Sequence, residues 1–466
     1  METIGIIGGG FSGLLSAIHL TEQAQLPLHI YIINKGSDFP KGIAYSTASP
    51  WLLLNVRAMG MSAFPDDLGH FVNWLKQHPA YSHKEEAELK MTFVPRMVYG
   101  EYLDSIWNSF KEKIKNQGLH KVSLIKDRVT GTVINDDGTA LQTEFNGTLN
   151  VNKVVLAVGH FAPSALPFSA EVLASHPAYF GNPWSRWEEN FVDKGGDAFI
   201  LGSGLTMVDT VLSLLNNNFK GKIYFNSRNG YLPMSHGNHV QTDFFKPEDL
   251  TSWRLTDLIK LYEHWANRYK DEGRPAFLAA DKFRPVTQQI WNTWTLGEKK
   301  FFLEHYKAFW NVRRHRIAEE VHVVIKNALA DGKLVLIKGK VDSVSTDSSL
   351  LTVHVNGEKG KQTFTNVGYF FNCTGPQETY QHSTDPLIRS LIDSGQAQAD
   401  DIDWGLKVND KYACIKSNGE ASDSVFATGC VIKGTYWETF AVPDLRKQVK
   451  ALATNIAQQL QSTTVS

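Results

Sequence analysis

A short apolar run close to the start of the chain is followed at once by a glycine-rich turn and then by a second apolar segment. The run is Ile4–Ile7, the turn is Gly8–Gly13 with the sequence GGGFSG, and the segment is Leu14–Leu20. A short apolar run bounded by a turn signal is typical of a buried strand, and glycine permits a sharp turn into a helix. The pattern therefore predicts a strand, a tight turn and a helix, in that order.

The same order recurs near the middle of the chain. Ala198–Leu201 is a second apolar run, Gly202–Met207 reads GSGLTM, and Val208–Leu215 is apolar again. Met207 stands where the first turn has its third glycine, so the second match is partial. This recurrence predicts a second strand–turn–helix unit.

Glycine turns of this spacing are typical of sites that bind the pyrophosphate of a dinucleotide. The first glycine allows the turn, the second lets the backbone approach the phosphates, and the helix N-terminus supplies free amides. A lone motif is as often a plain strand-to-helix turn, but two in the same context favour two bound dinucleotides. The residues predicted to contact them are Gly8, Gly10, Phe11, Ser12, Gly13, Gly202, Gly204, Leu205 and Thr206.

The segment Leu28–Ile33 reads as the second strand of the first unit. An acidic residue is expected near its end, where it binds the ribose hydroxyls. This chain has Asn34 and Lys35 instead, and Asn34 offers a hydrogen bond without a charge. A loop is predicted over Asp38–Pro50, followed by a mixed apolar and helical region to about Gln117.

A β-rich stretch with hairpin signals comes next. Alternation predicts strands at Val129–Ile134 and Ala140–Phe145, joined by a turn at 135–138 and followed by a turn at Asn146-Gly147. An apolar strand, Lys153–His160, closes the stretch.

A related stretch follows the second glycine turn. Strands are predicted at Lys333–Ser345 and Leu351–Val355, with a turn at Asn356-Gly357 and a strand over Tyr369–Gly375. In the C-terminal part of the chain, the pattern predicts a strand at Val425–Gly429 and a helix over residues 443–460.

These elements predict an α/β fold with two three-layer Rossmann-like dinucleotide-binding domains. The first domain is expected over residues 1–185 and is completed by a return segment, 376–466. The second is expected over 186–375, with an aromatic-rich helical insertion at about 246–329 that holds the basic cluster Arg313–Arg316. A solvated or anion-binding face and an internal salt-bridge set are equal readings of that cluster.

Length and charge narrow the class of protein. At 466 residues the chain is too long for one core, and its net charge of −1, without a long basic run, argues against nucleic acid. The sequence begins without a basic, cleavable leader, and no run approaches the ~20 apolar residues of a membrane span. We therefore expect a cytoplasmic protein without a membrane partner.

The cysteines and histidines argue against a metal site. Cys373, Cys414 and Cys430 are too far apart for a C-x-x-C dithiol or a thiolate zinc cluster. His236 and His239 lack acidic or cysteine neighbours at metal-ligand spacing, so no metal is proposed and an ordinary loop histidine is the favoured reading of each.

Further distinctive motifs are spread along nearly the whole chain. They are Gly42–Ser46, Leu53–Met59, Met61–Phe64, Phe71–Leu75, Val94–Leu103, Trp310–Arg316, Ala427–Gly429 and Gly434–Pro443. In combination with the two glycine turns, they make the chain resemble the two-dinucleotide-binding flavoproteins. Within these it is most similar to the FAD/NAD(P)-binding proteins related to flavin-dependent N-hydroxylating monooxygenases.

The resemblance implies FAD at the first glycine turn, NADPH or NADH at the second, and a C-terminal segment that returns to cover the flavin. An acidic residue often follows the final Thr-Gly in flavoproteins, and Cys430 takes its place here. Besides the glycine turns, cofactor contacts are implied at Asn34, Lys35, Ala44, Tyr45, Asn55, Val56, Met61, Ser62, Arg96, Val129, Gly159, Gly429, Cys430, Trp437 and Thr439.

Asn55 and Arg57 are the candidates for chemistry, because the related loop passes beside the flavin ring. Asn55 would hydrogen-bond flavin or nicotinamide, and a loop asparagine that caps local backbone is an equal reading. Arg57 would pair with a cofactor phosphate or a substrate carboxylate, although a structurally paired arginine is somewhat favoured. Arg96 shares a helix face with two tyrosines and would help to close the flavin pocket.

Arg228 follows the strand of the second unit that should end near the adenosine ribose. A guanidinium there can bind a 2′-phosphate, whereas an acid would repel it. This residue favours NADP over NAD, and NAD remains the alternative.

The expected function is an FAD-dependent NAD(P)H oxidoreductase, and in particular a monooxygenase. It would hydroxylate a small amine or amino acid with molecular oxygen through a flavin hydroperoxide. The F-x-G-x-x-x-H-x-x-x-W/Y motif of flavin monooxygenases is absent between Gly159 and Trp184. A reductase or oxidase without oxygenation, and a non-catalytic redox sensor marked by Asn34 and Cys430, are the alternatives. Flavin enzymes are often dimers, so a homodimer is a prior expectation only.

Overall fold

The computed structural model describes residues 1–135, 138–346, 349–358 and 360–465. It divides into two compact units, one made of residues 1–47, 56–160 and 378–466, and the other of 48–55 and 161–377. The limits predicted from sequence are 185/186 and 375/376, whereas the chain changes unit at 47/48, 55/56, 160/161 and 377/378. The predicted turn positions Asp136 and Asp137 lie outside the described residues.

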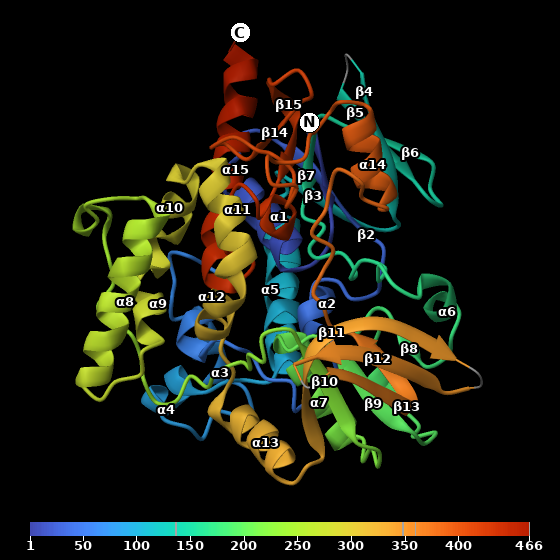
Figure 1. The fold of residues 1–466 in the computed structure, drawn as a ribbon. Coiled ribbons are helices and arrows are strands. Elements are labelled where there is room, and N and C mark those ends of the chain that lie inside the picture. The colour runs from blue at the N-terminus through green and yellow to red at the C-terminus, as the bar shows by residue number, and fades with distance from the viewer. Residues whose placement is uncertain (136–137, 347–348, 359, 466) are drawn as a thin grey trace. The chain divides into compact units, whose positions relative to one another are not determined.

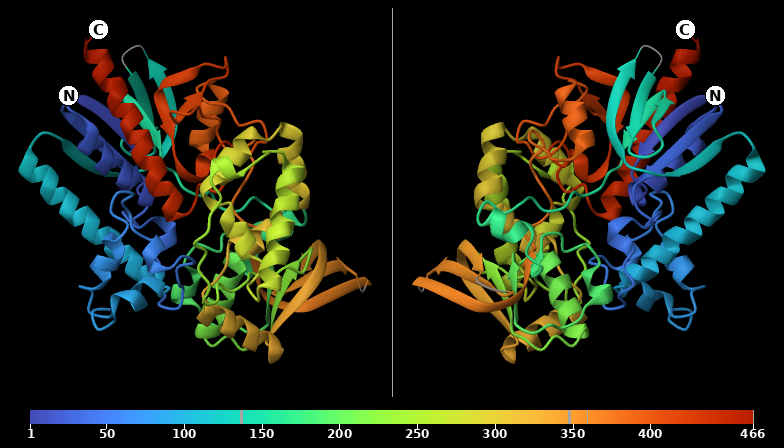
Figure 2. Two further views of the ribbon diagram at one scale, coloured as in Figure 1. Left: turned by 90° about the vertical axis from the view of Figure 1, so that its left-hand side faces the viewer. Right: turned by 90° about the vertical axis from the view of Figure 1, so that its right-hand side faces the viewer.

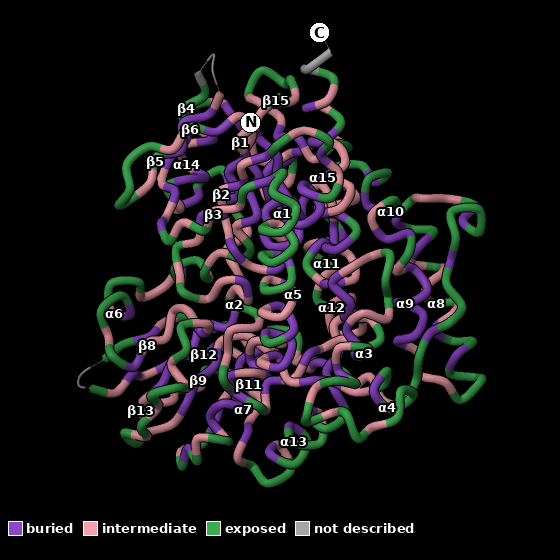
Figure 3. The backbone as a smooth tube through the Cα atoms, turned by 180° about the vertical axis from the view of Figure 1, so that it is seen from behind, coloured by how far each residue is buried: buried purple, intermediate pink, exposed green. Residues whose placement is uncertain are grey.

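A six-stranded sheet forms the centre of the first unit, in the order β14-β15-β7-β1-β2-β3 (Figure 1). Its strands pair in parallel except for the antiparallel pair β14–β15. β1 is buried from Ile4 to Ile7, as expected for a strand covered on both faces (Figure 3). The bounds are β1 Glu2–Ile7, β2 Leu28–Asn34, β3 Lys121–Lys126, β7 Lys153–Leu156, β14 Ala413–Ile415 and β15 Ala421–Ala427.

Helices and a second sheet complete the layers of this unit. Helix α1 contacts the C-terminal helix α15, and a three-stranded antiparallel meander, β4-β5-β6, packs with helix α14. The amide of Thr132 on β4 donates to Ser390 Oγ on α14 at 3.1 Å. The bounds are α1 Phe11–Gln23, α5 Arg96–Gln117, α14 Pro386–Asp393, α15 Val442–Val465, β4 Val129–Asn135, β5 Gly138–Thr143 and β6 Thr148–Val151.

Short helices occupy the region between β2 and α5. One of them, α2 at Gly42–Tyr45, lies inside the predicted loop over Asp38–Pro50, so that part of the prediction is wrong. A Cβ on Gly100 of α5 would lie 2.4 Å from Tyr45 O, so glycine lets α2 pack closely on α5. The remaining bounds are η1 Ala58–Gly60, α3 His70–Leu75, α4 Glu86–Met91 and η5 Gly429–Ile432.

The second unit has its own six-stranded sheet, in the order β12-β11-β10-β9-β13-β8. β12 also pairs with β13, and the long strands β11, β12 and β13 extend together away from the helices of this unit (Figure 2). The bounds are β8 Tyr179–Phe180, β9 Asp197–Leu201, β10 Ile223–Ser227, β11 Leu334–Thr346, β12 Leu351–Gly357, β13 Gly360–Asn372, α6 Ala170–Ala174, η2 Trp187–Asn190, α7 Leu205–Asn216 and α13 Glu319–Ala330.

Four β-structure predictions are wrong in detail. Asn356 and Gly357 do not form the turn, because Gly357 still pairs with Gly360 across the β12–β13 hairpin. The strands predicted over Lys153–His160 and Tyr369–Gly375 end earlier, at Leu156 and Asn372, before the chain turns away from each sheet. The strand predicted to end at Phe145 ends at Thr143, where Asn146-Gly147 forms the expected turn: Thr143 N donates to Gly147 O at 2.8 Å.

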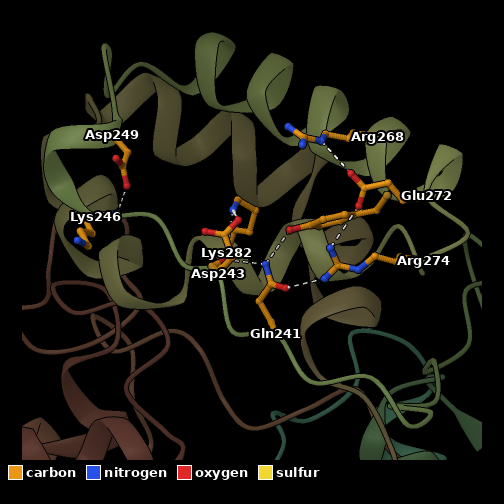
Figure 4. A network of polar contacts seen from close by, with 9 residues as sticks. Gln241, Asp243, Lys246, Asp249, Arg268, Glu272, Arg274 and Lys282 are labelled. Atoms are coloured by element: carbon orange, nitrogen blue, oxygen red, sulfur yellow. Dashed lines mark hydrogen bonds and ion pairs between the residues drawn. The ribbon is translucent and has the colours of Figure 1, made fainter.

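Helices fill the segment between β10 and β11 of the second unit. Buried Lys282 binds Asp243 Oδ2 at 2.5 Å (Figure 4). Its ammonium nitrogen also lies 4.0 Å from the ring centre of Trp265. Arg316 pairs with buried Asp281 at 2.5 Å, so at this residue the basic cluster is an internal salt bridge. The bounds are η3 Pro247–Asp249, α8 Leu255–Asp271, α9 Leu278–Lys282, η4 Arg284–Val286, α10 Thr287–Thr293, α11 Leu296–His305 and α12 Lys307–Arg314.

Within the described ranges, none of the helices combines the length and the apolarity that crossing a membrane requires. Among the same residues, no group of three or more His, Cys, Asp or Glu side chains is placed to hold a metal ion.

Candidate dinucleotide-binding sites

The first glycine turn joins β1 to α1 in a conformation that only glycine adopts readily. Gly8 has φ 109°, its amide donates to Ile33 O at 2.9 Å, and a Cβ on it would lie 2.2 Å from Ala157 O. Gly10 caps α1 with extended backbone, φ −85° and ψ −162°. A Cβ on Gly13 would lie 1.9 Å from Gly8 O, so glycine is also required for the close contact between helix and turn.

The second glycine turn repeats this geometry between β9 and α7. Gly202 has φ 116°, its amide donates to Asn226 O at 3.0 Å, and a Cβ on it would lie 2.3 Å from Cys373 O. Gly204 caps α7 with φ −82° and ψ −166°, and a Cβ there would have nothing within 4 Å. Buried Met207 takes the place of Gly13, so α7 does not approach its turn as closely at this position.

Both helices present backbone amides ahead of their first internal hydrogen bond. In α1 that bond runs from Leu14 N to Gly10 O at 3.0 Å, which leaves Phe11, Ser12 and Gly13 in the first turn. In α7 it runs from Val208 N to Gly204 O at 3.3 Å, which leaves Leu205, Thr206 and Met207 there. Neither first turn contains an acidic residue. Free amides and the positive end of a helix dipole fit a pyrophosphate in each unit. Gly204 also faces open space, whereas a Cβ on Gly10 would lie 3.5 Å from Gly42 Cα.

Asn34 uses its side chain to brace the first turn. Its Oδ1 accepts from Gly9 N at 3.0 Å, and its Nδ2 donates to Gly36 O at 3.0 Å and to Asp38 Oδ1 at 3.1 Å. An aspartate could not make the two donated bonds, because an ionised carboxylate only accepts. The amide at this position therefore holds the loop, and Lys35 beside it is exposed.

The C-terminal segment of the first unit lies against the first turn. Gly429 has φ 76°, and a Cβ on it would lie 3.5 Å from Ser12 Oγ. Gln448 on α15 holds this position, since its Oε1 accepts from Gly429 N at 2.7 Å and from Thr428 Oγ1 at 2.8 Å. Gln448 was not predicted from sequence, because nothing local marks a helix glutamine for this role.

Cys430 and His160 form a neutral pair beside this segment. Cys430 Sγ lies 3.1 Å from His160 Nε2. Burial raises the pKa of the Cys430 thiol to about 12. Desolvation by the surrounding protein atoms, reinforced by Lys433, lowers the pKa of His160, although the residue itself is exposed. At neutral pH both groups are therefore uncharged, and the imidazole tautomer decides which of them donates the hydrogen bond. His160 is a second residue that the sequence reading did not single out.

An aromatic cluster stands next to the short helix α2. The rings of Tyr45 and Tyr99 lie 4.6 Å apart, and those of Tyr99 and Tyr102 lie 5.3 Å apart. Burial raises the pKa of Tyr45 to about 12, against the opposing charge of Arg96. Arg96, Tyr99 and Tyr102 are all buried on one face of α5, as their spacing predicts.

The other predicted contacts in the first unit fall into two groups. Met61, Ser62, Val129, Trp437 and Thr439 are buried, whereas Ala44 and Gly159 are exposed. The polar groups of Ser62 already have partners within the protein. Its Oγ donates to Phe64 O at 3.2 Å, and its carbonyl accepts from Arg446 Nη1 on α15 at 2.9 Å. Arg57 lies 5.4 Å from the ring centre of Phe93, a packing contact, and its neighbour Val56 is half-buried.

Asn55 and Arg228 both belong to the second unit. The backbone oxygen of Asn55 lies 3.0 Å from His236 Nε2. Arg228 is exposed directly after β10, and the turn that follows is closed by Gly230 N donating to Ser227 Oγ at 3.1 Å. A Cβ on Gly230 would lie 3.6 Å from Lys338 Cδ, so a second basic side chain approaches this turn.

The sequence matches one family model, and the fold matches solved structures. Residues 5–161 match the family model described as FAD-NAD(P)-binding. This part of the chain is an FAD-NAD(P)-binding domain. The match contains the first glycine turn and the strands β1, β2 and β7 around it. No curated protein matches the sequence of this chain at the significance required.

Solved structures match almost the whole chain. The reduced form of ornithine hydroxylase from Pseudomonas aeruginosa has a TM-score of 0.67 at 14% identity, covering 98% of this chain and 99% of that one. An ornithine N-hydroxylase from Kutzneria sp. 744, solved with reduced FAD, NADP⁺ and L-ornithine, has a TM-score of 0.65 at 13% identity, covering 99% of both chains. The bacillithiol disulfide reductase of Staphylococcus aureus has a TM-score of 0.53 at 14% identity, again covering 99% of both. The chain therefore has the α/β fold of flavin-dependent oxidoreductases, with two Rossmann-like domains.

Proposed function

We propose that this protein is an FAD-dependent NAD(P)H oxidoreductase that uses molecular oxygen to hydroxylate a nitrogen of a small amine or amino acid. The observation that carries the proposal is the repetition of one glycine-turn geometry in two separate units. Gly8 and Gly202 share their φ value to within a few degrees, 109° and 116°, and Gly10 and Gly204 share their extended caps. Two such turns accommodate two dinucleotides, which a hydride transfer from nicotinamide to flavin requires.

FAD is assigned to the first unit and NADPH to the second. The family match includes the first turn, and Gly429 closes over that turn as a returning C-terminal segment would. Gly8, Gly10, Ser12 and Gly13 would hold the FAD pyrophosphate. In the second unit, Gly204 would face the NADPH pyrophosphate, and Arg228 would bind its 2′-phosphate.

FAD, when bound, supplies the redox chemistry, accepting a hydride and passing electrons on to oxygen. The residues of this chain bind and orient the two cofactors and exclude water. Tyr45, Tyr99 and Tyr102 form an apolar wall in the first unit, and their raised pKa values keep the phenols neutral at physiological pH. Asn55 and Arg57 remain the candidates for contact with the reacting rings or the substrate.

Nitrogen hydroxylation is preferred over plain reduction because of the structural neighbours and the cysteines. Two of the neighbours named above are ornithine hydroxylases, whereas the disulfide reductase has a lower TM-score. Cys373, Cys414 and Cys430 are all buried as free thiols, and burial raises the pKa of each to about 12. Such thiols are poor nucleophiles for disulfide exchange. A reductase or oxidase with another acceptor, and a redox sensor, remain the alternatives.

Coupling of NADPH oxidation to an amine substrate tests the proposal. NADPH consumption, oxygen uptake and peroxide release are measured with L-ornithine, L-lysine, cadaverine and matched compounds that lack the terminal amine. The proposal predicts that one amine stimulates NADPH oxidation without an equal release of peroxide, and that the amine-free analogue does not. NADPH oxidation that always yields peroxide would instead support an oxidase, and flavin that NADPH does not reduce would support the sensor.

A further inference from the structure

Residues 48–55 belong to the second compact unit, although the chain on both sides of them belongs to the first. Leu52 and Leu54 are buried, and Leu52 N donates to Ser49 O at 3.4 Å. We call this stretch the 48–55 segment. It carries Asn55, a candidate contact for flavin or nicotinamide, at its C-terminal end. Whatever fixes this segment in the second unit therefore also fixes the place of Asn55 within that unit.

The contact that reaches the end of the segment is made by a histidine 181 residues further along the chain: His236 Nε2 lies 3.0 Å from Asn55 O. A carbonyl oxygen has no proton to give, so Nε2 must donate. Both the neutral Nε2–H tautomer and the protonated ring keep that hydrogen. The hydrogen bond therefore does not depend on the ionisation of His236, and Nε2 is committed to it.

Backbone hydrogen bonds join the loop around His236 to the segment at Ile317. His236 N donates to Ile317 O at 3.0 Å, and Ile317 N donates to Met234 O at 2.9 Å. Ser235 forms a parallel bridge with Ile317, and its hydroxyl binds Glu319 at the start of α13. The loop that carries the histidine is thus joined to an ordered segment of the same unit.

We propose that His236 is a positioning residue: its Nε2–H group holds the Asn55 carbonyl and so fixes the 48–55 segment in the unit that binds NADPH. This inference rests on the proposed function, because its consequence is a faster hydride transfer to FAD. A side chain that can donate a hydrogen bond at this position can replace the histidine, whether or not it titrates. Glutamine meets that condition and leucine does not.

The test compares His236→Leu, His236→Gln and a control, His239→Leu, which removes an exposed histidine of the same loop. Hydrogen–deuterium exchange of the 48–55 segment is measured in the FAD-loaded protein, together with its melting temperature. Losing one hydrogen bond to a partly buried carbonyl should raise exchange in the segment roughly five- to tenfold in His236→Leu. His236→Gln and His239→Leu should stay within about twofold of the wild type. Unchanged exchange in His236→Leu would overturn the proposal whether or not the wild type is an active oxidoreductase.

The kinetic arm measures the rate constant for flavin reduction by NADPH under anaerobic conditions. We expect His236→Leu to slow reduction by a factor similar to its exchange effect, with FAD content unchanged, and His236→Gln to restore the rate and the wild-type pH profile. If both variants are equally slow, or if the glutamine variant loses an ionisation seen in the pH profile of the wild type, His236 acts as an acid or base and the positioning role is wrong. A wild type whose flavin NADPH does not reduce would count against the proposed function. The exchange measurement would still decide whether His236 holds the 48–55 segment.

Discussion

Asn34 Oδ1 accepts a hydrogen bond of 3.0 Å from Gly9 N, and this contact ties the end of β2 to the first glycine turn. The same side chain donates to Gly36 O and Asp38 Oδ1. An acidic residue is the usual occupant of this position in dinucleotide-binding folds, where it binds the ribose. In this chain the amide is structural, and an acid in its place would face the carboxylate of Asp38.

Asn34→Asp should therefore weaken the site rather than improve it. The variant loses two donated hydrogen bonds and places two carboxylates next to each other, which should lower the free energy of unfolding by about 1–3 kcal/mol. FAD affinity, measured by quenching of flavin fluorescence, should fall with it. Adding Asp38→Asn restores a donor and should recover part of the loss, whereas Asp38→Asn alone is the control. Tighter FAD binding by Asn34→Asp would contradict this account and favour a ribose contact.

The two glycines of the second turn should respond differently to alanine. Gly202→Ala puts a side chain at φ 116° and 2.3 Å from Cys373 O, so it should destabilise the second unit by more than about 2 kcal/mol. Gly204→Ala meets nothing within 4 Å and should cost less than about 1 kcal/mol in thermal unfolding. Its methyl group would nevertheless occupy the approach of the NADPH pyrophosphate, and the Kd for NADPH should rise at least tenfold. Equal stability of the two variants would show that the turn geometry is not what requires glycine.

Arg228→Ala tests which nicotinamide dinucleotide the second unit binds. A charge-assisted pair with a 2′-phosphate contributes about 1.5–3 kcal/mol, so the KM for NADPH should rise roughly 10- to 100-fold while the KM for NADH changes little. Lys338→Ala, on the neighbouring strand β11, is the comparison, since Lys338 already pairs with Glu358 at 2.5 Å. Equal effects of Arg228→Ala on both dinucleotides would remove the argument for NADPH.

Asp400 gives the first unit a pH-dependent stability. Burial, with Asp403 and Asp401 nearby, raises its pKa from 3.8 to about 6 against the hydrogen bonds from the amides of Ile402 and Trp404. A carboxyl group with a higher pKa in the folded state binds more protons there, so stability falls as pH rises from about 4 to about 6. Asp400→Asn keeps both accepted bonds and should be more stable than the wild type by up to about 3 kcal/mol at pH 8, and by little at pH 4. A stability difference that does not change with pH would contradict this.

Local pattern was sufficient for the parts of the site that lie next to each other in sequence. Both strand–turn–helix units and the position of Arg228 after β10 follow from apolar runs and glycine spacing. The brace at Asn34 was not predicted, because it depends on the parallel pairing of β1 with β2, which places Ile33 beside Ile7 and so brings Asn34 to the turn. What a single sequence lacks is the register that shows such neighbours.

Contacts between distant segments could not be read from sequence. His236 meets Asn55 across 181 residues, and Cys430 meets His160 across 270, with no periodic signal linking either pair. The turn predicted at Asn356-Gly357 failed for a related reason. The antiparallel pairing of β12 with β13 continues through Gly357, so strand register overrode a strong local turn signal.

The central claim is that this chain carries FAD and NADPH in two units and passes electrons between them. It is tested most directly by the visible spectrum of the purified protein during an anaerobic titration with NADPH. The account predicts an oxidised flavin band that bleaches at stoichiometric NADPH and returns when oxygen is admitted. A protein that shows no flavin band, even after FAD is supplied, would contradict the account.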